Sequence, residues 1–281
     1  MITIDELPAK VSGMPMSQYL SHPAMSRSFI CSCMEGGGEV QKFLEDGYSV
    51  FSGNAGTSMG SNFDTLLMNV IAGDSLESQL RIPPEDVLGA NGSRSTKAYK
   101  EWAAAQKDGV VCSEDEAWKF RRMFKAIREH EAAWGLVSAT VATQNSCFGV
   151  IEGHLVKVRP DAELEHKWWD LKTTSSPKSM ISKSVKSFHY GEQEWLYVQV
   201  AMQFGLPRFS MPFLFVSTVP PFWCEVWELP PDYVDECGER MLNAMELIAL
   251  RRETGEYLPL DHGKVKQLEI PDWVRKTQEV F

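Results

Sequence analysis

The sequence predicts an α/β fold, in which a central mixed sheet is flanked by helices and preceded by a helical amino-terminal portion. Helical periodicity dominates the first half of the chain, whereas the second half alternates β-branched and aromatic runs with further helical patterns. The 281 residues contain no linker-like break, internal repeat or low-complexity tract. We therefore expect a single domain over 1–281, mainly helical over 1–135, with the core of the sheet in 136–281.

Four helices are expected in the amino-terminal portion. Their periodic segments run from about 15 to 50, 58 to 72, 95 to 107 and 113 to 134. The last begins at a capping box, in which the side chains of Ser113 and Glu116 each accept a hydrogen bond from the other residue's backbone. The polar segment from Arg81 to Ser95 contains prolines and glycines, so it is expected to be a mobile loop.

The second portion alternates strands with two helices. Strands are expected near 137 to 143, 146 to 152, 154 to 161, 166 to 173, 211 to 218 and 222 to 229. A helix over 189–204 is closed by Gly205, the residue type that helix ends favour. A long helix over 231–253 begins at the Pro230-Pro231 pair, because proline is tolerated in the first turn.

Two successive predicted strands carry charged residues at alternating positions. Residues alternate faces along a strand, so Lys157, Arg159 and Asp161 share one face of the strand that Asp161 is expected to end. On the next strand Asp170 and Lys172 are two residues apart and therefore point the same way. The sequence thus predicts that two carboxylates and one lysine converge.

This combination suits the hydrolysis of phosphodiesters. The reaction requires that charge on the phosphate be neutralised and that a water be activated, which Mg²⁺ held by carboxylates can do. Mg²⁺ prefers oxygen ligands, so the backbone carbonyl of Leu171, between the two site residues, is a further candidate ligand. Lys172 would hold or deprotonate the attacking water. The pattern therefore points to a metal-dependent nuclease, although an Asp-x-Lys triplet alone also arises by chance.

The helix over 189–204 presents Tyr190, Gln193 and Tyr197 on one stripe. Such a stripe is often only part of a hydrophobic core. A glutamine in its middle favours a polar task instead, since a buried amide needs hydrogen-bond partners. Both interpretations remain open at this stage.

The order of these motifs resembles one family. Arg159-Pro160-Asp161, then Asp170-Leu171-Lys172-Thr173-Thr174, then Tyr190-x-x-Gln193-x-x-x-Tyr197 are similar to the exodeoxyribonuclease VIII-like family of PD-(D/E)xK nucleases, which is related to lambda-type phage exonuclease. Weaker matches lie upstream at Ser26-Arg27-Ser28 and from Met59 to Asp64, and downstream from Leu268 to Trp273. The likeness covers most of the chain.

The resemblance implies a fold, an activity and partners. It implies a PD-(D/E)xK core that uses Mg²⁺, for which Mn²⁺ can substitute, and an exonuclease that degrades linear double-stranded DNA from its 5′ end to leave 3′ tails for recombination. It also implies a homo-oligomeric ring that encloses DNA ends and a single-strand annealing protein as partner. The implied catalytic residues are Asp161, Asp170, Lys172, Gln193 and Tyr197.

Two positions depart from the family pattern. Asp64 stands where the family has a histidine, and Gln144 stands where it usually has a glutamate. A carboxylate is a hard donor that suits Mg²⁺ or Mn²⁺, whereas a neutral amide coordinates weakly. The expected metal ligands are therefore Asp64, Asp161, Asp170 and the carbonyl of Leu171. The alternative is that Asp64 lies on the surface of its helix.

The net charge of −10 is unfavourable for DNA binding, because phosphates repel an acidic protein. The segment from Leu171 to Gly191 offsets this locally, since it is rich in serine and lysine and contains no acid. The expected DNA contacts are Lys178, Lys183, Lys186 and Arg159.

Other classes of protein are disfavoured. The first residues lack a basic region with a hydrophobic stretch, and no apolar run of about 18 residues occurs, so we expect a cytoplasmic protein without a membrane span. The six cysteines show neither a disulfide framework nor a zinc pattern. Only Cys224 and Cys237 follow Lys172, too few for an iron–sulfur cluster after the catalytic lysine.

Two alternatives to the 5′ exonuclease remain open from the sequence. The first is an endonuclease, or an exonuclease of the other polarity, built on the same core. The second is a non-catalytic protein that binds DNA ends, which the departures at Asp64 and Gln144 would suit. The retained charged cluster argues against the second, because like charges repel unless a metal offsets them.

Overall fold

The computed structural model describes residues 6–48, 55–106, 108–258, 262–265, 267 and 269. Residues 1–5, on which the expectation of a cytoplasmic protein rests in part, lie outside this range. So does most of the downstream segment that contributes to the family resemblance. Within the described residues, no helix combines the length and the apolar character that crossing a membrane requires.

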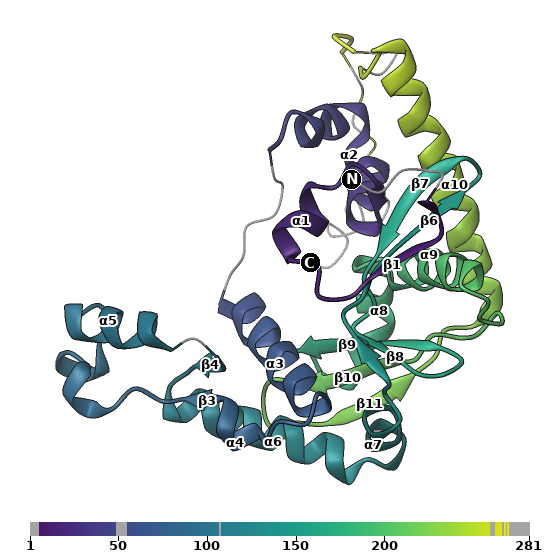
Figure 1. The fold of residues 1–281 in the computed structure, drawn as a ribbon. Helices are drawn as coiled ribbons and strands as arrows, with labels where there is room; N and C mark the ends of the chain where they lie inside the picture. Colours follow the sequence, from purple (N-terminus) through teal and green to yellow (C-terminus); the bar gives the residue numbers. More distant parts are fainter. Residues whose placement is uncertain are drawn as a thin grey trace, which may run out of the picture.

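Two sheets form the centre of the molecule (Figure 1). The first has the strand order β1-β6-β7-β2, with β1 at Ala9–Val11, β6 at Ser146–Ile151, β7 at His154–Val158 and β2 at Met25–Ser26. The second has the order β11-β10-β9-β8-β5, with β11 at Cys224–Trp227, β10 at Phe213–Ser217, β9 at Trp168–Thr174, β8 at Ala162–Glu163 and β5 at Ala142–Thr143. Strand β9 pairs parallel with β10 and antiparallel with β8, so the expected mixed sheet is confirmed.

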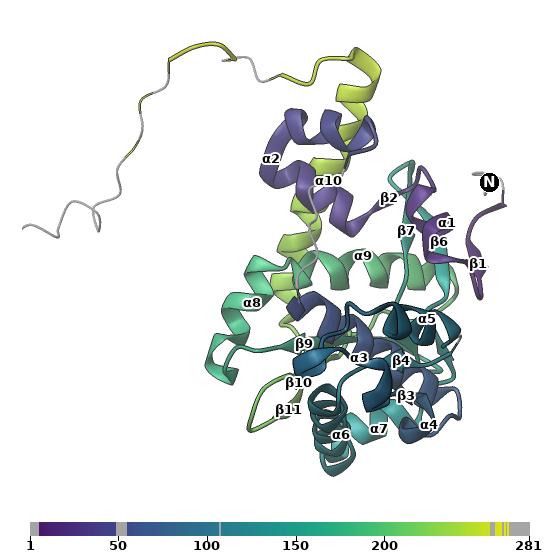
Figure 2. The same ribbon diagram turned by 90° about the vertical axis from the view of Figure 1, so that its left-hand side faces the viewer.

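Helices cover both faces of the second sheet. Trp168, Phe213 and Phe215 belong to the core that α9 (Tyr190–Gln203), α10 (Pro231–Thr254) and α2 (Arg27–Glu45) complete. Trp169 and Leu214, one residue along each strand, belong to the core formed with α3 (Ala55–Ile71), α6 (Glu114–Glu129) and α7 (Glu131–Ser138). Alternating side chains thus bury both faces, and Figure 2 shows α9 between the sheet and the pair α2 and α10.

The single helix expected over 15–50 is wrong. The chain forms α1 (Met16–Ser21), then the short strand β2, and only then α2. Pro23 follows the end of α1, and proline cannot supply the N–H group that a continuing helix needs. The side chain of Ser26 then caps α2 by accepting a hydrogen bond of 3.3 Å from the N–H of Phe29.

Between residues 113 and 143 the structure differs from the prediction in one helix and one strand. The helix expected over 113–134 begins at the predicted capping box, but it is divided at His130, whose ring accepts a hydrogen bond of 3.2 Å from the N–H of Ala133 and so starts α7. Because α7 continues to Ser138, the strand expected over 137–143 is wrong and only β5 remains. Helices expected over 58–72 and 95–107 correspond to α3 and α5 (Lys97–Ala105).

Several short elements were not expected. Besides β1, β2 and β8, these are α4 (Leu76–Gln79), β3 (Leu80–Arg81), β4 (Val110–Val111), α8 (Ile181–Ser187) and the 3₁₀ turns η2 (Glu85–Val87), η3 (Ala90–Gly92) and η4 (Lys178–Met180). They are too short to carry a periodic pattern. Most of the segment expected as a loop over 81–95 is irregular, as η2 and η3 are single turns.

The strand expected over 154–161 ends earlier, and this changes the place of one site residue. Strand β7 ends at Val158, so Asp161 does not end a strand but lies in the connection to β8. Pro160 in this connection has no N–H to donate to a sheet. The chain therefore leaves the first sheet and enters the second within a few residues of Asp161.

Candidate active site

The structure brings the predicted site residues together in one pocket. Its volume is about 630 Å³, and its lining includes Asp64, Asp161, Asp170, Leu171, Lys172, Gln193 and Tyr197. These residues come from α3, from the β7–β8 connection, from β9 and from α9, four segments that are distant in the sequence. The predicted convergence of two carboxylates and a lysine is therefore present.

Asp170, Lys172 and Gln193 form a closed network on the face of β9 that α9 covers. The side-chain nitrogen of Gln193 donates a hydrogen bond of 2.6 Å to Oδ1 of Asp170. Its side-chain oxygen accepts a hydrogen bond of 2.8 Å from Nζ of Lys172, which also forms an ion pair with Oδ2 of Asp170. The Lys172 ammonium lies 4.6 Å from the ring centroid of Tyr190, a cation–π contact. Gln193 thereby fixes the positions of both charged groups.

Asp161 is held against β9 by the backbone. Its Oδ2 accepts a hydrogen bond of 2.8 Å from the N–H of Leu171, and its carbonyl accepts one of 3.1 Å from the N–H of Gln144. Burial raises the pKa of Asp161 well above its usual range, and the nearby carboxylates of Asp170 and Asp64 raise it further. Lys172 acts in the opposite direction. The site thus concentrates negative charge that a cation would relieve.

Asp64 faces this pocket from α3. Its Oδ2 accepts a hydrogen bond of 2.9 Å from the side-chain amide of Gln144, whereas its Oδ1 is buried without a hydrogen-bond partner among the described residues. Burial, followed by repulsion from Asp170, raises the pKa of Asp64 to about 6. The two residues that depart from the family pattern therefore contact each other.

Gly60 allows α3 to approach the sheet at this point. A Cβ atom at Gly60 would lie 2.5 Å from Oγ1 of Thr173 on β9, which is closer than side chains tolerate. Asp64 follows Gly60 by four residues, one helical turn later. In the Gly-x-x-x-Asp motif, Gly60 thus allows the close contact between α3 and β9, and Asp64, one turn later, presents its carboxylate to the pocket.

The donor set fits a hard divalent cation in its chemistry. Three carboxylates line the pocket, and Oδ1 of Asp64 lacks a donor. The N–H and C=O of one strand residue point to the same side, so the carbonyl of Leu171 is directed like its N–H, toward Asp161. However, no three acidic, histidine or cysteine side chains of the described residues already surround one point as ligands do. Both side-chain oxygens of Asp170 are bonded to protein groups, Oδ1 to Gln193 and Oδ2 to Lys172.

The aromatic residues of the α9 stripe have mainly packing contacts. Tyr190 stacks on Phe213, with ring centroids 5.5 Å apart. The hydroxyl of Tyr197 donates a hydrogen bond of 3.4 Å to the carbonyl of Arg159, the first residue of the β7–β8 connection. Tyr190 therefore belongs mainly to the hydrophobic core, whereas Gln193 makes the polar contacts that its position suggested.

Two basic residues, Lys157 of β7 and Arg159 just after the strand, fasten the amino-terminal segment to the site. Lys157, which sequence reasoning did not assign a role, donates hydrogen bonds to the carbonyls of Tyr19 at 2.6 Å and His22 at 2.7 Å, at the end of α1. Arg159 donates one of 2.8 Å to the carbonyl of Met14. The sequence signal for this role was a lysine at a strand position that faces inward, because a buried ammonium needs several hydrogen-bond acceptors.

The predicted DNA contacts are not gathered in the pocket. Arg159 lines it, but its guanidinium is partly occupied by Met14 and, at 3.3 Å, by the hydroxyl of Ser146. Lys178 forms an ion pair with Glu225. Lys183 and Lys186 are exposed on α8, away from the pocket lining.

The comparisons with known proteins bear on the fold. No family model matches the chain, and no curated protein matches it by sequence. A solved structure from Eubacterium rectale, provisionally named as an exonuclease, superposes with a TM-score of 0.59 at 13% identity, covering 99% of each chain. LHK-Exo in complex with dAMP matches at 9% identity over 70% of this chain and 96% of that chain, but with a TM-score of 0.27, which is too low to carry an argument. The predicted α/β fold is thus confirmed as one that the Eubacterium rectale protein shares.

Proposed function

We propose that this protein is a metal-dependent deoxyribonuclease that hydrolyses phosphodiesters in the pocket around Asp161 and Asp170. The observation that carries the proposal is the network in which Gln193 holds Asp170 and Lys172 beside Asp161. Clustered carboxylates with raised pKa values beside a lysine, in a pocket, are typical of catalytic sites. The shared fold with a protein named as an exonuclease supports the same reaction class.

The protein residues divide the work. Asp64, Asp161, Asp170 and the Leu171 carbonyl would hold Mg²⁺, or Mn²⁺ in its place, which when bound supplies a Lewis acid for the phosphate and lowers the pKa of water. Lys172 would place its ammonium beside the attacking water or the phosphate. Gln193 would keep Lys172 oriented, and Tyr197 would support the connection that carries Asp161.

The finer proposal is an exonuclease on linear double-stranded DNA that proceeds 5′→3′ and leaves 3′ single-stranded tails for recombination. It rests on the resemblance of the motif order to the exodeoxyribonuclease VIII-like family. The same resemblance suggests a homo-oligomeric ring and a single-strand annealing protein as partner. A ring would help to explain DNA binding by a chain of net charge −10, since an inner surface can be locally basic.

The test is product analysis on a linear duplex labelled separately at each 5′ and 3′ end, with Mg²⁺ and with chelator. Mononucleotides released first from the 5′ label, only with metal, are expected. Early release of the 3′ label, or cutting of closed circular DNA, would replace the 5′ exonuclease with the other nuclease candidates. Binding of DNA ends without any cleavage would favour the non-catalytic end-binding protein, for which the complete bonding of Asp170 is the supporting observation.

A further inference from the structure

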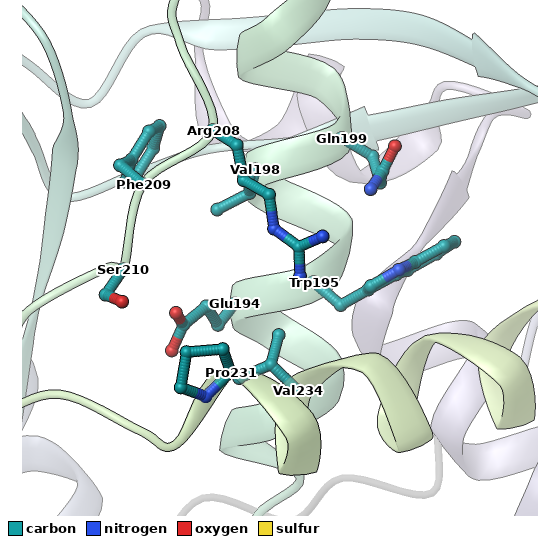
Figure 3. Close-up of a pocket in the computed structure, with 9 residues that line it drawn as sticks. All are labelled: Glu194, Trp195, Val198, Gln199, Arg208, Phe209, Ser210, Pro231 and Val234. Atoms are coloured by element: carbon teal, nitrogen blue, oxygen red, sulfur yellow. The ribbon is translucent and has the colours of Figure 1, made fainter.

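A second pocket lies on the opposite side of α9, outside the residues that the proposed nuclease uses. It has a volume of about 230 Å³ and lies between α9, the connection that precedes β10 and the start of α10 (Figure 3). Its lining consists of Glu194, Trp195, Val198, Gln199, Arg208, Phe209, Ser210, Pro231 and Val234. None of these residues lines the Asp161 pocket.

The pocket contains a buried carboxylate with one unused oxygen. Glu194 is only 2% exposed, and its Oε1 accepts a hydrogen bond of 3.0 Å from the N–H of Met211. Its Oε2 is buried and has no hydrogen-bond partner among the described residues. Burial raises the pKa of Glu194 to about 7, and the nearby carboxylate of Glu228 also raises it. An unsatisfied buried acceptor destabilises the folded chain, so a donor at this place is favoured.

The remaining lining defines what kind of donor fits. Val198, Phe209 and Val234 give the pocket apolar walls. The only cationic side chain of the lining, Arg208, forms an ion pair with Asp235 outside the lining. Figure 3 shows the Glu194 carboxylate on the same side as the Ser210 hydroxyl, so both polar groups lie beside the apolar walls.

Three ligand classes are disfavoured by these contacts. An anion would be repelled by Glu194, because Arg208 is already paired. A purely apolar molecule would leave Oε2 unsatisfied. A hard divalent cation would find one carboxylate with one free oxygen, fewer ligands than Mg²⁺ or Ca²⁺ requires.

We propose that this pocket binds a primary ammonium group on an apolar stem, with the ammonium donating to Oε2 of Glu194 and the stem lying against Val198, Phe209 and Val234. This chemistry occurs in free alkylamines and in the lysine side chain of a polypeptide. Both carry a charged hydrogen-bond donor at the end of a chain of methylene groups. The charged end suits the Glu194 carboxylate, and the methylene groups suit the apolar walls of the pocket.

The test measures binding of three probes to the full chain by ligand-observed NMR: n-pentylammonium, Nα-acetyl-lysine-N-methylamide and the neutral n-pentanol. We expect saturable binding of at least one amine, at least about tenfold tighter than pentanol. Tighter binding of pentylammonium assigns the site to free amines, and tighter binding of the lysine derivative assigns it to a polypeptide lysine. Equal binding of pentanol, or no saturable binding of either amine, would overturn the proposal.

Two variants locate the binding. Glu194→Gln keeps the shape but removes the charge, so amine affinity should fall at least about tenfold. Glu228→Gln is the matched control, because it removes a neighbouring carboxylate that is exposed and paired with Lys167, and affinity should change less than about twofold. Unchanged affinity in Glu194→Gln would contradict the assignment. The probe comparison on the unchanged chain remains decisive if that variant folds poorly.

Discussion

The backbone N–H of Leu171 donates a 2.8 Å hydrogen bond to the carboxylate of Asp161, which ties the β7–β8 connection to the central strand of the site. Such an N–H group in a strand normally donates its hydrogen bond to a neighbouring strand. Here β8 begins only at Ala162 and so does not extend opposite Leu171, and the side chain of Asp161, which also lines the pocket, accepts the hydrogen bond instead. The position of Asp161 therefore depends on the backbone of β9.

Replacing Asp161 with Asn should abolish DNA cleavage and leave the fold intact. The amide still accepts the hydrogen bond from Leu171, but it removes a charge that burial and Asp170 oppose, so thermal stability should be equal or higher. Cleavage of labelled duplex and the midpoint of thermal unfolding check this. Asp46→Asn, on an exposed ion pair with Lys42, is the control that should retain activity. Near-normal turnover of the Asp161 variant would remove this residue from the site.

Replacing Lys172 with Ala should lower turnover by about 10² or more, with a smaller loss of DNA binding, since it removes the ammonium beside Asp170. Single-turnover rates and DNA affinity separate the two effects. Lys119→Ala is the matched control, because Lys119 is paired with Asp115 outside the pocket lining. If the Lys172 variant lost only affinity, Lys172 would be a phosphate contact.

Replacing Gln193 with Leu should reduce both turnover and stability. A glutamine whose only role was in catalysis would affect turnover with little loss of stability. The buried amide, however, bonds Asp170 and Lys172 at once, so its removal should also cost about 1–3 kcal/mol in the free energy of unfolding. Urea unfolding and cleavage assays test the two effects. Full activity with reduced stability would show that Gln193 only packs.

Replacing Asp64 with Asn should weaken the binding of Mg²⁺, so that a higher Mg²⁺ concentration is needed for half-maximal activity. Asp64→His should restore activity and shift the preference toward metals that accept nitrogen ligands. Metal titrations of the cleavage rate measure both effects. Asp74→Asn, on a residue that bonds Gln79 outside the pocket, provides a control. An unaltered Mg²⁺ requirement in Asp64→Ala would leave the metal to Asp161, Asp170 and the Leu171 carbonyl.

Replacing Glu194 with Gln should change how stability depends on pH. The pKa of Glu194 is raised to about 7 in the folded chain from an ordinary value of 4.5, so the folded state retains a proton that the unfolded chain loses. Wild-type stability should therefore fall, relative to the variant, as pH rises from about 4.5 to about 7, by roughly 1–3 kcal/mol. Urea unfolding at pH 5 and pH 8 measures the difference. A constant difference between the two proteins would contradict the raised pKa.

The local part of the site was predictable from the sequence. Asp170 and Lys172 face the same side because strand residues alternate, and Gln193 lies on the expected stripe of α9. The place of Asp161 was predicted less well, because the pattern of alternation continues past Val158 although hydrogen bonding stops there. A periodic sequence pattern shows which face of the strand each side chain occupies. It does not show where hydrogen bonding to a neighbouring strand stops.

Contacts between distant segments could not be predicted. The bond between Gln144 and Asp64 joins residues that seemed to be two separate departures from a pattern. The division of the expected helix over 113–134 depends on a hydrogen bond to the ring of His130. Helix α8 was missed because its serine- and lysine-rich sequence has no apolar stripe long enough to recognise. Of these two hydrogen bonds, only the one between Gln144 and Asp64 joins distant segments, since the hydrogen bond at His130 spans three residues.

Beside Asp161 the chain passes from the first sheet to the second. This connection is therefore a point about which the two sheets could move relative to each other. Two bonds brace it from outside the pocket: Lys10 of the first sheet pairs with Glu163 of the second, and the side-chain amide of Asn145 donates 2.7 Å to the same carboxylate. A change in the angle between the sheets would strain the hydrogen bond from Leu171 that holds Asp161 beside Asp170, while the hydrogen bonds between the strands of each sheet stayed intact. Loosening the brace should therefore impair catalysis before it unfolds the chain.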